Sequence, residues 1–152
     1  MPRTLVLGLG NDLLADDGVG VAVASRLVGV REDGVEIVTS AAHGLELLDL
    51  FLGYDRAIVI DAIQTTEHPP GTVLELGVED LRPVIAPSPH YAGLPELCRL
   101  ADALRLDFPS EVRILAVVAA DLHTVGAGMT AAVEDCIPAL CDRVRRMLGA
   151  RE

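Results

Sequence analysis

The chain has 152 residues, an apolar fraction of 51% and a formal net charge of −11. This length fits one domain, which we expect to span residues 1–152, and the apolar fraction excludes a disordered chain. An acidic surface repels phosphate, so nucleic acid is not an expected partner. No apolar run approaches the ~20 residues needed to span a bilayer, and the first apolar run is too short for a signal peptide. We therefore expect a cytoplasmic protein with no membrane contact.

Short apolar runs alternate with helical patterns along the chain. Five runs predict strands, at Thr4–Leu9, Glu36–Thr39, Arg56–Ile60, Gly71–Leu76 and Glu111–Val118. Four segments predict helices, at Asp16–Leu27, Gly44–Leu52, Leu94–Leu106 and Thr130–Leu148, with Asp16 and Thr130 as N-caps. This order predicts a three-layer α/β/α sandwich around a mostly parallel five-stranded sheet. The third and fourth strands follow each other without a helix, which predicts one antiparallel strand.

Residue types exclude several catalytic classes. The sequence contains no lysine, which excludes a P-loop lysine and Schiff-base chemistry. Its three cysteines, Cys98, Cys136 and Cys141, form no CxxC pair, and we interpret Cys136 and Cys141, five residues apart on a predicted helix, as buried apolar side chains. No serine lies in a GxSxG setting, and no cysteine lies at a strand end beside a histidine. Serine and cysteine hydrolases are therefore not supported.

The loop after the first strand is acidic. Gly8 and Gly10 begin a dinucleotide-binding pattern, but Leu13 stands where the third glycine belongs. Asp12, Asp16 and Asp17 crowd the position that a pyrophosphate would take, and their charges would repel it. The loop therefore favours a cation over a phosphate.

Three metal-binding side chains follow three predicted strands. Asp17 follows the first strand, Asp61 follows Ile60 directly, and His90 lies in the proline-rich loop after the fourth. Each has a simpler explanation by itself: a helix cap for Asp17, a turn residue for Asp61, an unengaged loop histidine for His90. Ligands bind at the carboxyl ends of strands in open α/β sheets, and carboxylate–histidine sites suit zinc, nickel and similar ions. We therefore expect these three residues to share one divalent metal. Weaker candidates for the same edge are His43 and His123, while His68 is expected in solvent.

The segment from Leu5 to Gly20, with its Gly-Asn step, paired acids and Gly-x-Gly ending, resembles the hydrogenase maturation endopeptidases. Gly44–Leu48, Ile60–Ala62, Gly71–Val73 and Ser88–Leu94 extend the resemblance over most of the chain. It implies an α/β/α sandwich and a metal held by Asp17, Asp61 and His90. It also implies a substrate, the nickel-loaded precursor of a nickel–iron hydrogenase large subunit, whose C-terminal extension is removed.

The resemblance also leaves questions open. Family members carry an acid followed by Gly-Gly-Thr after the second strand, where this chain has Thr39–His43, and His43 is a candidate replacement. The metal in function would be the nickel of the precursor, with zinc or cadmium as substitutes. Metal-activated water and a carboxylate base both remain open as mechanisms. Two alternatives are a non-catalytic nickel-binding module of hydrogenase assembly and a small-molecule enzyme on a Rossmann-like sheet. We expect a monomer.

Overall fold

A computed structural model describes residues 2–30, 32–42, 44–80 and 94–149. Its strands form one sheet in the order β2-β1-β3-β5-β4. The pairs β1–β2, β1–β3 and β3–β5 are parallel, and β4 runs antiparallel along β5. The predicted antiparallel strand is therefore confirmed, at an edge of the sheet and beside β5 rather than β3. The strands are β1 (Thr4–Leu9), β2 (Val35–Ser40), β3 (Arg56–Ile63), β4 (Val73–Gly77) and β5 (Glu111–Val118).

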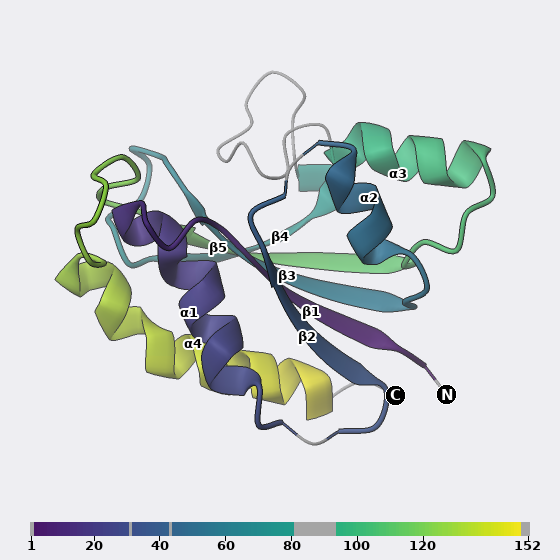
Figure 1. The fold of residues 1–152 in the computed structure, drawn as a ribbon, viewed down its shortest axis with the longest axis horizontal. Helices are drawn as coiled ribbons and strands as arrows, with labels where there is room; N and C mark the ends of the chain where they lie inside the picture. The colour runs from purple at the N-terminus through teal and green to yellow at the C-terminus, as the bar shows by residue number, and fades with distance from the viewer. Residues whose placement is uncertain (1, 31, 43, 81–93, 150–152) are drawn as a thin grey trace.

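Helices cover both faces of the sheet, which confirms the predicted α/β/α sandwich (Figure 1). α1 (Val19–Leu27) and α4 (Ala131–Gly149) pack on one face, and α2 (Glu46–Phe51) and α3 (Leu94–Ala103) pack on the other. Alternate residues of each central strand point to opposite faces, so both must be apolar. The continuous apolar runs of β1 and β3 follow from this double burial. No helix within the described ranges is long and apolar enough to cross a bilayer.

Two glycines bring α1 against the sheet. A Cβ on Gly20 would overlap the backbone carbonyl oxygens of Leu9 and Ile60, and a Cβ on Gly8 would overlap the carbonyl oxygen of Gly20. The helix therefore lies directly on β1 and β3, closer than any side chain would allow. This contact fixes the first turn of α1, and the segment before it, over the carboxyl ends of these strands.

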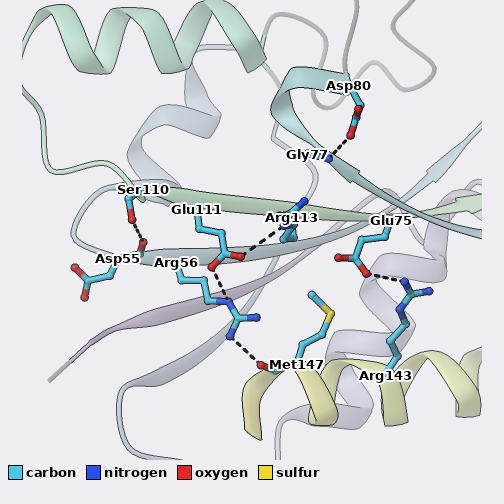
Figure 2. Close-up of polar contacts among 10 residues, drawn as sticks. All are labelled: Asp55, Arg56, Glu75, Gly77, Asp80, Ser110, Glu111, Arg113, Arg143 and Met147. Atoms are coloured by element: carbon cyan, nitrogen blue, oxygen red, sulfur yellow. Dashed lines mark hydrogen bonds and ion pairs between the residues drawn. The ribbon is translucent and has the colours of Figure 1, made fainter. Parts of the chain in front are cut away.

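Apolar packing fixes α4 together with the polar contacts that Figure 2 shows. Arg143 forms an ion pair of 2.6 Å with Glu75 of β4, and Arg56 of β3 donates to the carbonyl oxygen of Met147 at 2.9 Å. Partly exposed ion pairs contribute only about 0–1 kcal/mol each. A fully buried aliphatic side chain contributes about 1.5–3 kcal/mol. Packing therefore dominates, through the buried side chains Val133, Ile137, Leu140, Val144 and Leu148.

Two boundaries differ from prediction in ways that affect the site. The helix expected from Asp16 begins at Val19, because residues Ala15–Gly18 form a separate 3₁₀ turn, η1. The strand expected to end at Ile60 continues to Ile63, so Asp61 lies inside β3 and not in a turn after it. β1 and β5 have the predicted bounds. The remaining elements shift at their ends, to Val35–Ser40 for β2, Glu46–Phe51 for α2, Val73–Gly77 for β4, Leu94–Ala103 for α3 and Ala131–Gly149 for α4.

Candidate metal centre and family

The parallel strands β1, β3 and β5 end at one edge of the sheet. Among the segments that leave this edge are residues 10–18 after β1, residues 64–72 after β3 and residues 119–130 after β5. The first and last of these lie side by side (Figure 1), and an antiparallel bridge joins Leu14 to Val125. This edge is where an open α/β sheet binds its ligand.

Asp17 lies in η1, directly above the end of β1. Only 7% of its surface is exposed, and its Oδ2 accepts a hydrogen bond of 2.9 Å from the backbone amide of Asn11. Gly10 makes this close position possible, because a Cβ there would overlap the backbone carbonyl oxygen of Asp17. The φ angle of Gly10 is 145°, which also favours glycine. The glycine pattern of this loop thus positions an acid.

Asp61 is fully buried in the neighbouring strand β3. Its Oδ1 accepts a hydrogen bond of 2.8 Å from the amide of Ala62, and it lies opposite Ala116 of β5. Gly8 of β1 pairs with Ile60, so Asp61 is one residue further along, level with the end of β1. The structure therefore places Asp17 and Asp61 at the carboxyl ends of adjacent parallel strands.

The third expected ligand, His90, lies outside the described residues, as does His43. Within the described ranges, no three His, Cys, Asp or Glu side chains are grouped closely enough to hold a metal ion. The two carboxylates supply oxygen donors, which suit a divalent cation when a further ligand completes the set. The shared site of Asp17, Asp61 and His90 therefore stays a prediction.

Asp16 has a different role from the one expected. It makes no capping hydrogen bond to η1 or α1, and its side chain is fully buried. Its Oδ2 accepts hydrogen bonds from the amides of Ala120 and Asp121 at 2.8 and 3.0 Å, and its Oδ1 accepts one from the amide of Thr130 at 2.7 Å. The Thr130 hydroxyl lies within 3.0 Å of both oxygens. Asp16 therefore fastens the acidic turn to residues 120–130, and its occupied oxygens make it a poor metal ligand.

The predicted cap Thr130 precedes α4, which begins at Ala131. Its backbone carbonyl accepts the first helical hydrogen bond, from the amide of Glu134 at 2.9 Å, as at an N-cap. Its hydroxyl does not cap the helix but donates to the carboxylate of Asp16. Nothing in the local sequence connects these two residues, which is why sequence reasoning missed the contact.

The side chain of Asp121 stabilises the loop after β5 by accepting hydrogen bonds within that loop. The hydroxyl of Thr124 and the amides of His123 and Thr124 lower the pKa of Asp121 below its ordinary value of 3.8. Asp121 is therefore ionised at neutral pH and fixes the turn that carries His123. His123 itself is exposed on this edge, as expected, and His68 is exposed after β3.

The cysteines offer no nucleophile. All three are free, and burial raises the pKa of each thiol, so they stay protonated near neutral pH. Cys98 borders a cavity of about 450 Å³ near the start of β5, at the opposite end of that strand from residues 119–130. The expectation that Cys136 and Cys141 are buried apolar side chains is confirmed for Cys141, whereas Cys136 is only partly buried.

Comparison with known proteins identifies the family. A family model described as hydrogenase maturation protease matches residues 21–147. The hydrogenase 2 maturation protease of Escherichia coli is 35% identical over 145 residues, which cover 91% of this chain and 86% of that protein. The hydrogenase expression/formation protein HupD of Rhizobium leguminosarum is 32% identical over 152 residues, which cover 97% of this chain and 74% of that protein.

Solved structures agree in fold. The hydrogenase maturating endopeptidase HybD from Escherichia coli superposes with a TM-score of 0.83 at 32% identity, over 96% of this chain and 91% of that one. The nickel–iron hydrogenase maturation protease HybD from Thermococcus kodakarensis is 24% identical and shares the fold, with a TM-score of 0.73 over 95% of this chain and 98% of that one. The resemblance noted in the sequence is thus confirmed. The chain belongs to the hydrogenase maturation protease family and is a hydrolase, an endopeptidase of that family.

Proposed function

We propose that this endopeptidase removes the C-terminal extension from a nickel-loaded large-subunit precursor of a nickel–iron hydrogenase. We propose further that Asp17, Asp61 and His90 bind the nickel ion carried by that substrate. The observation that supports this best is the pair of buried carboxylates on adjacent strand ends, in a chain of this family. Zinc or cadmium would fit the same donors in place of nickel.

The geometry of the two acids favours positioning of the substrate. Asp61 is fixed by the amide of Ala62 and by its place in a central strand, and Asp17 by the amide of Asn11. Because these carboxylates are already fixed, they lose little conformational entropy when they bind an ion. An ion bound here would place the adjoining peptide next to the sheet edge. Water then adds to the scissile carbonyl carbon, the C–N bond breaks, and the new amine takes up a proton.

Either carboxylate can serve as the base that removes a proton from the attacking water, or the bound cation can activate that water. The burial of Asp61 strengthens its charge interactions, since water is excluded around it. We propose that the chain acts as one domain, as a monomer and in the cytoplasm, where a precursor would meet it before assembly.

The test is cleavage of a purified nickel-loaded precursor by the purified chain, followed by mass spectrometry of the released peptide. Asp17→Asn and Asp61→Asn keep the side-chain size but remove the charge, so cleavage should fall by about 100-fold or more. Asp142→Asn is the matched control, because Asp142 is exposed on α4 and pairs only with Arg145 in the described contacts. Calorimetric titration with Ni²⁺ should show weaker binding in the two site variants.

Three results would contradict the proposal. The first is no cleavage of any nickel-loaded precursor by the wild-type chain. The second is equal cleavage of precursors with and without nickel. The third is wild-type cleavage by folded Asp61→Asn protein, which would remove Asp61 from the site. Circular dichroism of each variant establishes that the fold is retained.

A further inference from the structure

Two large apolar side chains are exposed at the edge that carries Asp17. Leu13 is 62% exposed and Val125 is 74% exposed. Leu13 lies two residues from Asn11, whose amide binds the carboxylate of Asp17. Val125 comes from the loop after β5, more than 100 residues away in sequence. Single exposed apolar residues need no explanation, but here two of them lie on neighbouring loops beside one candidate site.

The two loops that carry them are joined by their backbones. Leu14 and Val125 form an antiparallel bridge, and the amide of Gly126 donates to the carbonyl oxygen of Leu13 at 2.9 Å. We call Leu13, Leu14 and Val125 the bridge surface. Asp16 fastens the same two loops from below, through the amides of Ala120 and Asp121. The bridge surface is therefore fixed before a partner arrives, which lowers the cost of ordering it on binding.

The charges beside the bridge surface are negative. Asp12 is exposed next to Leu13, and Asp121 stays ionised in the second loop. The chain as a whole has a net charge of −11. A partner that covers Leu13 and Val125 would meet these carboxylates at its rim. Basic side chains on the partner would be attracted to them, and acidic ones would be repelled.

We infer that the bridge surface docks the protein substrate, through a segment that presents an apolar side chain flanked by basic residues. The inference rests on the proposed function, since it assigns the docking surface for that same substrate. Its continuity with Asn11 and Asp17 places the docked segment beside the candidate metal centre. Docking here would raise affinity and leave the chemical step unchanged.

The experiment measures the dissociation constant of the nickel-loaded precursor, together with kcat and KM for its cleavage. Leu13→Ser and Val125→Ser remove exposed apolar surface, so each should raise the dissociation constant and KM roughly fivefold to thirtyfold, with kcat unchanged. Asp12→Asn should also weaken binding and reduce its dependence on salt. Titration of each variant with Ni²⁺ alone should match the wild type.

Val28→Ser and Leu104→Ser are the matched controls, because these side chains are 68% and 59% exposed and lie at the ends of α1 and α3. They should bind the precursor as the wild type does. Normal binding by both bridge-surface variants, or an equal loss in the controls, would overturn the inference and leave the proposed function standing. A wild-type chain that binds the precursor without cleaving it would overturn the proposed function alone. A chain that neither binds nor cleaves would overturn both.

Discussion

The carboxylate of Asp16 binds both the amide and the hydroxyl of Thr130, 114 residues further along the chain, at 2.7 and 2.9 Å. The same carboxylate holds the amides of Ala120 and Asp121. The turn that carries Asp17, the loop after β5 and the start of α4 are thereby joined at one point. These hydrogen bonds of Asp16 also fix the position of Asp17 in the candidate site, because Asp17 follows Asp16 directly.

Asp16→Ala should lower the free energy of unfolding by about 2–4 kcal/mol, because three part-buried amide donors lose a charged acceptor that is itself fully buried. Thr130→Val removes only the hydroxyl contact and should cost about 1 kcal/mol. Urea denaturation of both variants measures the difference. An Asp16→Ala protein as stable as the wild type, or less affected than Thr130→Val, would contradict the anchoring role.

Local patterns predicted most of the fold. The apolar runs of β1, β3 and β5 are long because both faces of these strands are buried, so all three strands were predicted, although their order in the sheet was not. The pairing of β4 with β5 was not evident, since it depends on contacts across residues 78–110. The start of α1 was placed early because an acid before an apolar helix is a common cap signal.

The site was predicted less completely than the fold. The rule that ligands meet at strand ends placed Asp17 and Asp61 at one edge, and the structure agrees with that placement. The predicted C-terminal end of β3 was wrong, because an aspartate after an apolar run usually begins a turn and Asp61 does not. The role of Asp16 depends on a partner 114 residues away, which no spacing rule reveals. His90 lies outside the described residues, so its part in the site stays a prediction.

The stability of the turn at Asp121 should decrease at acid pH. Its carboxylate has a lowered pKa in the folded protein, so its contribution to stability is present above pH 3.8 and is lost as pH falls through the folded pKa. The amide ¹⁵N shifts of His123 and Thr124, followed by NMR, should change with a midpoint below 3.8. Asp121→Asn should abolish this step. A midpoint at or above 3.8 would show that these hydrogen bonds do not favour the ionised form.

The departure from the family pattern after β2 can be reversed. Thr39 is exposed near the end of β2, where it pairs with Gly8. An acid there would add favourable charge toward a bound cation, so Thr39→Asp should keep the rate of precursor cleavage or raise it up to about fivefold. Thr39→Asn is the control, with the same size and no charge. Slower cleavage by Thr39→Asp than by Thr39→Asn would contradict the charge argument.

The contact of α1 with the sheet offers a sharp test of how the fold positions Asp17. A Cβ on Gly20 would meet the backbone oxygens of Leu9 and Ile60, which have no freedom to move aside within a central sheet. Gly20→Ala must therefore push the helix away, and should lower the free energy of unfolding by about 2–4 kcal/mol. Because Asp17 lies three residues earlier, precursor cleavage should fall as well.

Gly29→Ala is the matched control for Gly20→Ala. Gly29 follows the same helix, and nothing lies within 4 Å of a Cβ built on it. This change should alter the free energy of unfolding by less than about 1 kcal/mol, in the stabilising direction, because it restricts the unfolded chain. Thermal unfolding and precursor cleavage, measured on both variants, separate a packing effect from a general effect of losing glycine. Equal stability in the two variants would mean that α1 can shift on the sheet without cost, and that Gly20 does not set the position of Asp17.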